Sequence, residues 1–525
     1  MNPRIRYSLT DLENQYYNQG NKKPLEDLVR AFQGIQKLPP TDPNSFFVIG
    51  GYHGEPFRGA GWGSSQWWGG YCNHGNVLFP TWHRAYCLRI EQALQSIPGC
   101  EDVMLPFWDE ASEDPQLLGV PTIPSILTQE TFELDNVTIN NPLKSYSFQQ
   151  SITSNVATTP GVPNPNYSKN LGYTTVRYPL SGLVGTEKDR KETEIHNAQF
   201  KDPVENVRLL NENVHDWLTG GIVMPDGYQP KFTIEKYRRS LDAPNYTVFS
   251  NTTSSQQWNQ DRTDALVNVP LESPHNDIHL AVGGFDIKDI SDASPISGAN
   301  GDMGENDTAG LDPIFFFHHA FVDRVFWLWQ KKHNKTDDLD IIDAYPGTNS
   351  VDSQGPTPGV AGGTWLTLDS ALAPFKKLDG SGQPMTSNDV VNIETQLGYT
   401  YGPGSLEKLP EKTPSDVSPD KMLRVANINR GAIGGSFMVS VWATKDGKDH
   451  LVGTESILSR WNVSGCANCQ AHLDVKVFLE IPRVLEDATE FKSRLHTRKI
   501  ASNELTRPLD PPITDVVHKI SNLPG

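Results

Sequence analysis

The chain has 525 residues and a formal net charge of −18, and 37% of its residues are hydrophobic. This length predicts two domains, and no apolar run reaches the roughly 20 residues that a membrane-spanning helix needs. The pI near 5.2 argues against nucleic acid and anionic membranes as partners, because both bind basic surfaces.

The N-terminal residues indicate a cytoplasmic protein, and the cysteines argue against extensive crosslinking. The residues after Met1 include charges but no apolar stretch that would form a secretory signal. Five cysteines are too few for a disulfide scaffold. Cys466 and Cys469 form an isolated Cys-x-x-Cys, which favours redox or metal chemistry over crosslinking.

Three stretches of the first 400 residues are predicted to be helices that carry chemistry. The first begins near Pro80, because proline suits the first turn of a helix, and continues through Leu94. The second surrounds residues 274–279. In the third, Asp312 is the expected N-cap, and the aromatic-rich segment 314–332 ends in two lysines. Loops rich in proline and glycine separate these stretches, so we expect a helical core wrapped in long loops.

A change in composition marks the boundary between the two domains. Residues 402–422 are rich in proline, serine and charged residues, as exposed linkers are. We therefore assign residues 1–402 to a first domain, 403–424 to a linker and 425–525 to a second domain. In the second domain, segments such as 436–443 and 473–481 alternate apolar and polar residues, which is typical of half-buried strands. The expected fold is a mainly α domain followed by a small β-sandwich.

Histidines are the residues most informative about function. A lone histidine is more often a surface or core residue than a ligand. His275 and His279, however, lie four residues apart on one face of a predicted helix, where both can bind one metal ion. Another predicted helix carries the pair His318 and His319 among aromatic residues. Upstream histidines form a further cluster, which comprises His53, His74 and His83.

The donor types in these clusters favour copper. Two sets of three histidines, with no evident carboxylate or thiolate to complete either set, argue against structural zinc, which prefers four closed ligands. Imidazole nitrogens suit copper, and three per ion leave room for a bridging ligand. A two-metal zinc hydrolase is disfavoured because the sets lack carboxylates.

Four strings in this sequence resemble the type 3 copper family, which comprises tyrosinases, catechol oxidases and molluscan-type haemocyanins. In chain order they are His-Gly-x-Pro-Phe, His-x8-His with Phe-Pro-x-Trp-His-Arg, His-Asn-x-x-His, and Asp-Pro-Ile-Phe-x-x-His-His-x-x-x-Asp-Arg. The match spans roughly residues 45–402, and within the family the sequence resembles the fungal members. It implies a four-helix bundle that holds two copper ions and uses O2 as co-substrate. The ligands would be His53, His74 and His83 for the first copper, and His275, His279 and His319 for the second.

The resemblance also implies roles for two neighbours of these ligands. His318 would be a packed, hydrogen-bonding neighbour rather than a ligand. Cys72 precedes His74 by two residues, as does the cysteine that forms a thioether with this histidine in fungal members. The alternative is a small buried thiol.

The activity implied is the oxidation of small phenols, such as tyrosine, DOPA and catechols, to o-quinones. Glu272 and Asn276 resemble the water-holding glutamate and the asparagine of members that attack monophenols, although Glu272 could instead cap a helix start. Leu280 is expected to face the entrance. These residues favour tyrosinase over catechol oxidase. A single catalytic domain without repeats disfavours a haemocyanin-like oxygen carrier.

The second domain resembles the shielding domain of latent members. Tyr399-Thr400-Tyr401 is similar to the mark that closes the family's catalytic domain, and we expect it to pack against Arg4 or Arg6. Ile457 or Leu458 is the expected plug over the coppers, and the alternative is that both belong to the sandwich core.

Activation of a latent enzyme would need a protease that cuts the linker, or acid that loosens the domain contact. Cys466 and Cys469 would transfer copper, the alternatives being a redox disulfide or two idle thiols. The sequence leaves the oligomeric state open, including a homo-oligomer.

Overall fold

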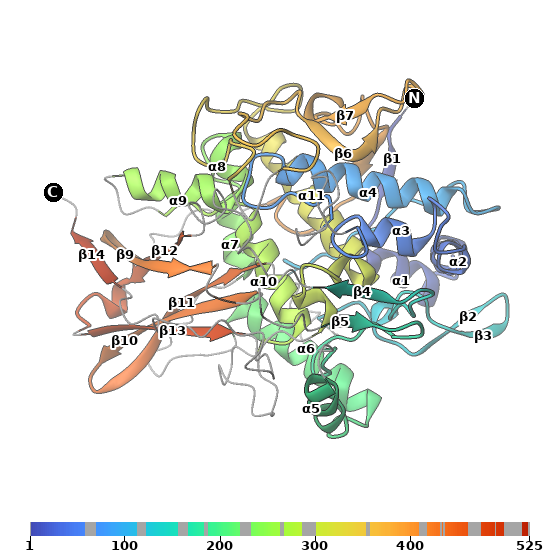
Figure 1. The fold of residues 1–525 in the computed structure, drawn as a ribbon, viewed down its shortest axis with the longest axis horizontal. Coiled ribbons are helices and arrows are strands. Elements are labelled where there is room, and N and C mark those ends of the chain that lie inside the picture. The colour runs from blue at the N-terminus through green and yellow to red at the C-terminus, as the bar shows by residue number, and fades with distance from the viewer. Residues whose placement is uncertain are drawn as a thin grey trace.

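The computed structural model describes most of the chain. The described residues are 2–57, 70–112, 122–155, 166–182, 187–220, 233–262, 267–285, 301–352, 357–408, 417–430, 433, 436–459, 474–488, 490–497 and 517–522. Helices occupy one side of the molecule and strands of the C-terminal part the other (Figure 1).

The helical part contains the three helices predicted to carry chemistry. They are α4 (Phe79–Gln95), α10 (Glu272–Gly283) and α11 (Ile314–Lys332), and Asp312 accepts a hydrogen bond from the Ile314 amide at 3.2 Å. Around them lie α1 (Leu9–Tyr17), α2 (Lys23–Lys37), α3 (Phe46–Gly51), α5 (Glu187–Asn197), α6 (Pro203–Thr219), α7 (Thr233–Ser240), α8 (Tyr246–Ser250) and α9 (Thr252–Asp261). Among the described residues, every helix is too short or too polar to cross a membrane.

Burial patterns explain how these helices pack. In α2, proline occupies the first turn, and Leu25, Leu28, Phe32 and Ile35 form one buried face. In contrast, α11 is buried along almost its whole length, as expected of a central helix. It packs against α4, which also contacts α2, whereas α10 packs against α6 and α7.

Short strands join distant parts of the helical domain. β1 (Arg4–Arg6) pairs in parallel with β8 (Tyr399–Tyr401). The Arg6 guanidinium lies 3.5 Å from the centre of the Tyr399 ring and donates to the Tyr401 hydroxyl at 3.1 Å, which confirms Arg6 as the packing partner. Where the structure describes this domain, it also contains the two-stranded pairs β2–β3 (Thr131–Leu134, Val137–Asn140), β4–β5 (Ile152–Asn155, Asn166–Lys169) and β6–β7 (Ala371–Lys376, Pro384–Thr386).

The described residues of the C-terminal part form two three-stranded antiparallel sheets, as predicted for a sandwich. One sheet has the order β11–β10–β13 (Lys448–Ile457, Phe437–Lys445, Glu490–Thr497) and the other β12–β9–β14 (Asp474–Pro482, Val417–Asn429, Val517–Asn522). Apolar side chains from both sheets, such as Val425, Val439 and Val477, form a core of their own.

Strand β9 begins earlier than the sequence pattern indicated. It starts at Val417, inside the range predicted as linker (403–424), although Pro419 and charged residues obscure the alternation there. The strand extends because its backbone pairs on both sides, with Pro482 opposite Val417 and Asn522 opposite Lys421.

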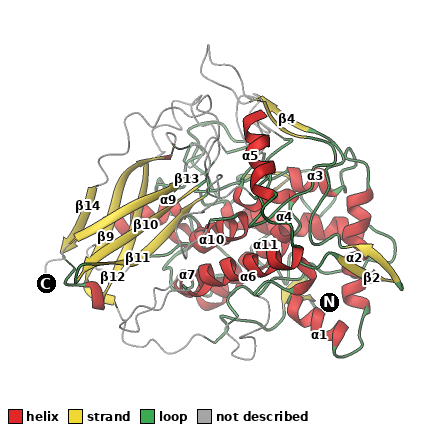
Figure 2. Ribbon diagram, turned by 90° about the horizontal axis from the view of Figure 1, so that it is seen from below, coloured by secondary structure: helices red, strands yellow, loops and turns green. Residues whose placement is uncertain are grey.

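The two parts meet along α9, α10 and one edge of the sandwich (Figure 2). β11 contacts α10, and β12 contacts α9. A small apolar cluster crosses the boundary, with Val267 from the helical part against Met422 and Phe478 from the sandwich. The sandwich therefore rests directly on the helix that carries His275 and His279.

Candidate metal centre

The six predicted ligand histidines converge in the interior of the helical part. All are at most 3% exposed. His83 comes from α4, His275 and His279 from α10, and His319 from α11, while His53 and His74 lie in the loops between α3 and α4. Two groups of possible ligand atoms within 4.8 Å of one another result, one with His53, Cys72 and His74, the other with His275, His279, His318 and His319.

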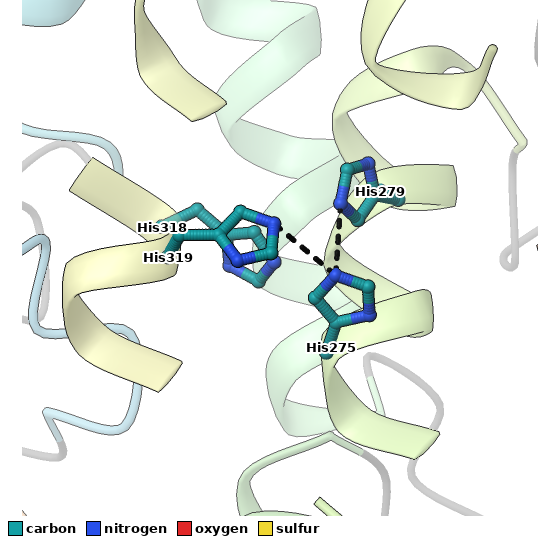
Figure 3. A group of neighbouring side chains, drawn as sticks. All are labelled: His275, His279, His318 and His319. Atoms are coloured by element: carbon teal, nitrogen blue, oxygen red, sulfur yellow. Dashed lines mark hydrogen bonds between the residues drawn. The ribbon is translucent and has the colours of Figure 1, made fainter. Parts of the chain in front are cut away.

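In the second set, three Nε2 atoms face one another (Figure 3). His275 Nε2 lies 3.1 Å from His279 Nε2 and 3.2 Å from His319 Nε2. The Nδ1 atom of His279 lies 2.8 Å from the Met303 carbonyl, and that of His275 lies 3.0 Å from Asn276 Oδ1. Because an oxygen acceptor requires the proton on Nδ1, the Nε2 atoms of His275 and His279 each present a lone pair, and facing lone pairs favour a cation between them. This arrangement fits a bound metal ion.

Two histidines of the first set are oriented in the same way. His53 Nδ1 donates to the Asn306 carbonyl and His83 Nδ1 to the Phe79 carbonyl, both at 2.8 Å. Among the described residues, His83 Nε2 is buried without a hydrogen-bond partner. A carbonyl behind the ring and an open nitrogen in front are the usual arrangement of a metal-bound histidine.

The two sets lie side by side. The rings of His83 and His319 are nearly parallel, with centres 4.5 Å apart, and those of His74 and His275 are 5.7 Å apart. Phe315 packs 4.8 Å from the ring of His53 and 4.1 Å from that of His319. The Phe315 ring therefore contacts a histidine of each set.

Electrostatics keep these imidazoles neutral. Burial, followed by the neighbouring histidines, holds the pKa values of His83, His275, His279 and His319 well below the usual range. Burial lowers the pKa of His318 to about 3. Neutral rings are the form that binds metal, so the site is competent to do so at neutral pH.

His318 is held by residues that sequence reasoning missed. Its Nδ1 lies 2.7 Å from Glu110 Oε1, and Glu110 Oε2 accepts from the Tyr237 hydroxyl at 2.7 Å. Burial raises the pKa of Glu110 well above its usual value. The bond agrees with the predicted role of His318 as a hydrogen-bonding neighbour, while the choice of His319 as the ligand stays a prediction. Two adjacent carboxylates, Asp109 and Glu110, directly after the apolar pair Phe107-Trp108 were the available signal.

Glu272 and Asn276 are both engaged by hydrogen bonds. Glu272 is the first residue of α10, and its carboxylate accepts from the Gly75 amide at 2.8 Å and from the Thr252 amide and hydroxyl at 2.8 and 3.0 Å. It therefore joins the loop after His74 to the start of α9, rather than capping its own helix. Burial raises the pKa of Glu272, and these donors partly offset the effect.

The remaining predicted residues have different surroundings. Leu280 is fully buried in the large core. Ile457 belongs to the sandwich core, which favours the alternative reading for this residue. Leu458 is 2% exposed and is not a member of that core. Cys466 and Cys469 lie outside the described residues.

The comparisons with known proteins agree with this geometry. Residues 43–332 match the family described as the common central domain of tyrosinase. A tyrosinase of Hahella sp. is 53% identical over 491 residues, which cover 90% of this chain and 87% of the relative. A tyrosinase of Aspergillus oryzae is 45% identical over 523 residues, covering 94% and 92%.

A solved structure gives the same result for the whole fold. The tyrosinase of Burkholderia thailandensis at low pH superposes with a TM-score of 0.85 at 50% identity, covering 99% of this chain and all of that one. The matches include bacterial and fungal proteins, so the similarity does not specify a fungal source. Since the family match covers more than half of the chain and the relatives span nearly all of it, this chain belongs to the tyrosinase family of copper oxidases.

Proposed function

We propose that the chain uses two copper ions and O2 to hydroxylate monophenols at the ortho position and to oxidise o-diphenols to o-quinones. The observation that carries this proposal is the convergence of the Nε2 atoms of His275, His279 and His319 beside the equally buried set of His53, His74 and His83. All six donors are imidazoles, which suits copper. Bound copper would supply the redox chemistry with O2.

The protein's own contribution is to fix the ligands and to handle the phenolic proton. A phenol has a pKa of about 10, so a monophenol must lose its proton before oxidation. We assign assistance in this step to Glu272 and Asn276. Burial raises the pKa of Glu272, which makes its carboxylate a stronger base than an ordinary one.

One observation favours a second candidate, catechol oxidase without attack on monophenols. Both carboxylate oxygens of Glu272 already accept hydrogen bonds from Gly75 and Thr252. A carboxylate held in this way is less available to a proton or a water molecule. Oxidation of an o-diphenol inserts no oxygen atom into the ring, so it avoids the step for which we assign Glu272 as the base.

We further propose that the sandwich keeps the enzyme latent. Support comes from the contacts of β11 with α10. The Ser456 carbonyl accepts from Asn276 Nδ2 at 3.2 Å, directly beside His275. Glu455 accepts from the Ser273 hydroxyl at 2.9 Å and lies 3.3 Å from Lys236. Leu458 follows these residues and is buried outside the sandwich core, so it is our candidate for the plug.

We make two further proposals, which concern the cysteines. Cys72 is buried next to His74, and we propose that the two form a thioether. The sulfur would bond to a ring carbon with loss of one hydrogen from each, and O2 would take the two electrons. For Cys466 and Cys469 we propose transfer of cuprous copper, because paired thiolates bind this soft ion well.

Oxygen uptake and quinone absorbance with L-tyrosine and L-DOPA, before and after limited trypsin treatment of copper-loaded protein, test the proposal. We expect both substrates to be oxidised after cleavage and neither at a comparable rate before. Oxidation of L-DOPA alone would establish the catechol oxidase. No turnover of either substrate by the cleaved, copper-loaded protein would contradict an enzymatic function and favour an oxygen carrier.

A further inference from the structure

One short segment supplies the backbone acceptors for a histidine of each set. Residues 302–308 lie between α10 and α11 and include a 3-10 turn (Asp302–Gly304). The Met303 carbonyl accepts from His279 Nδ1 and the Asn306 carbonyl from His53 Nδ1, both at 2.8 Å. The position of this segment therefore affects where both rings point.

A buried lysine binds the residue that precedes each of these carbonyls. Asp302 precedes Met303, Glu305 precedes Asn306, and Lys169 Nζ at the end of β5 contacts both carboxylates, with Glu305 Oε2 at 3.1 Å. The side chains of Lys169 and Asp302 are fully buried, and that of Glu305 is 1% exposed. One cation thus fixes two points of the segment.

Neutral groups complete the contacts of the two carboxylates. Asp302 Oδ2 accepts from the Tyr173 hydroxyl at 2.7 Å and from the Val176 amide at 2.8 Å. The Thr308 hydroxyl lies 2.9 Å from Asp302 Oδ1 and 3.1 Å from Glu305 Oε2. Because a buried carboxylate is costly unless it is paired and hydrogen-bonded, the segment is restricted to this arrangement.

Close backbone packing transmits the position of the segment to the site. The Glu55 amide donates to the Asp307 carbonyl at 2.8 Å, and a Cβ on Gly54 would lie 2.3 Å from the same oxygen. The segment therefore abuts the chain directly after His53, with no side chain between them.

We infer that Lys169 is a positioning residue for the copper centre, which holds residues 302–308 so that His53 and His279 present their Nε2 atoms at the correct separation. This inference rests on the proposed function, because it assumes that both sets bind copper. Lys169 would touch neither copper nor substrate. A role confined to stability is the alternative, and it predicts no selective effect on metal binding.

The test compares copper affinity, measured by competition with a chelator, with the thermal midpoint of the metal-depleted protein. Lys169→Met removes the cation, and Lys169→Arg retains it. Thr308→Val is a milder change that leaves the ion pairs in place. Arg6→Met is the matched control, because Arg6 is equally buried and ion-paired, with Glu91 at 2.8 Å, but holds no residue of the 302–308 segment.

We expect Lys169→Met to weaken the binding of both copper ions by roughly 10–100-fold, the usual effect of removing an outer partner of a ligand. Lys169→Arg should recover most of the affinity, and Arg6→Met should lower the midpoint without weakening copper binding. In copper-loaded Lys169→Met, the EPR signal per bound cupric ion should rise as the two ions couple less strongly.

Unchanged copper affinity in Lys169→Met, or a loss confined to one copper, would overturn the inference. If Lys169→Met does not fold, Thr308→Val decides: a loss of a few-fold at both coppers supports the inference, and no loss overturns it. A wild-type chain that cannot bind two copper ions would instead contradict the proposed function, and this inference with it.

Discussion

Four histidines of the metal centre are held by a hydrogen bond at Nδ1, the ring nitrogen that points away from the centre. Backbone carbonyls of Phe79, Met303 and Asn306 hold three of the rings, and the side chain of Asn276 holds a fourth. A carbonyl oxygen has no alternative protonation state, so it sets the tautomer of the ring as well as its direction. These contacts therefore leave Nε2 as the nitrogen that can bind metal in all four rings.

Removal of a single ligand should reduce copper binding from two ions toward one. We expect His83→Ala and His279→Ala each to lose one copper, because two remaining imidazoles hold an ion weakly. His196→Ala is the control, since His196 is also buried but bonds to the Pro179 carbonyl away from the centre. Atomic absorption on purified protein measures the number of copper ions per chain. Two retained coppers in either ligand variant would show that the assignment is wrong.

The proposed thioether predicts a covalent change that depends on metal. Protein exposed to copper and O2 should contain a crosslinked peptide with Cys72 and His74, lighter by two hydrogens than the two separate residues require. Peptide mass spectrometry detects it. Cys72→Ser and metal-depleted protein should lack the product, whereas Cys87→Ser should retain it. Cys72 that remains alkylatable after full copper loading would contradict the proposal.

At the scale of elements, α10 owes its position to a close approach at its C-terminal end. A Cβ on Gly283 would lie 2.2 Å from the Gly304 amide nitrogen, so helix and 3-10 turn touch through bare backbone. The Gly301 amide donates to the Gly283 carbonyl at 2.8 Å. This contact brings the Met303 carbonyl within reach of His279.

Gly283→Ala should therefore be destabilising in spite of the helix propensity of alanine. Propensity would contribute about 1 kcal/mol in favour of alanine, whereas overpacking typically costs about 1–3 kcal/mol and here meets backbone that cannot rotate away. Chemical denaturation measures the difference. Gly362→Ala is the control, because its Cβ would lie 3.7 Å from Val351, an ordinary contact. Equal stability of the two variants would argue against a tight junction.

The elements that could be predicted from the sequence are those with local signals. Proline in the first turn and histidines at helical spacing were sufficient for α4 and α10. Helix α11 was also predicted, but its N-cap is Pro313 rather than the predicted Asp312, whose carboxylate still accepts from the Ile314 amide. Backbone acceptors such as the Met303 carbonyl have no residue signature, so they could not be predicted. The bond between Glu110 and His318 joins residues 208 positions apart, and no local pattern reports such a pairing.

At the scale of the whole molecule, the contact between sandwich and helices includes a charged cluster. Glu455 of β11 and Asp277 of α10 both contact Lys236 of α7, with side-chain exposures of 18%, 0% and 12%. Burial alone would lower the pKa of Lys236, but Asp277 and Glu455 raise it above its usual value of 10.5. Burial raises the pKa of Glu455, and Lys236 opposes that effect.

These shifts bear on release of the sandwich by acid. A lysine with a raised pKa stabilises the closed form fully below 10.5 and loses this effect only as the pH rises through its folded value. A carboxyl with a raised pKa binds its proton more tightly in the closed form, so acidification through that pKa favours closure. The directions of the pKa shifts of Lys236 and Glu455 both argue against loosening of this cluster by moderate acid. We expect exposure to about pH 5 to leave L-DOPA oxidation at neutral pH unchanged; activation equal to that by trypsin would show that other groups govern release.

Shortening Glu455 should open the molecule where acid does not. Glu455→Ala removes the acceptor for Ser273 and one partner of Lys236, and we expect L-DOPA oxidation before cleavage to rise by about tenfold, as a change of roughly 1.4 kcal/mol in closure implies. Glu455→Gln keeps an acceptor and should remain latent. Asp449→Ala is the matched control, since Asp449 pairs with Lys492 and Arg494 within the sandwich. Rates relative to those after trypsin are the readout, and latency of Glu455→Ala equal to that of wild type would contradict the role.

The pairing of β1 with β8 brings the two ends of the helical part together, so that this part of the chain forms a ring closed by hydrogen bonds. Its first strand (Arg4–Arg6) lies beside its last (Tyr399–Tyr401), and the Arg6 side chain fastens the two. A cut beyond residue 408 would leave this ring intact, since no strand of the helical part pairs with the sandwich among the described residues. The same closure means that the old ends could be joined and new ends opened in a surface loop, a circular permutation that should still present all six histidines.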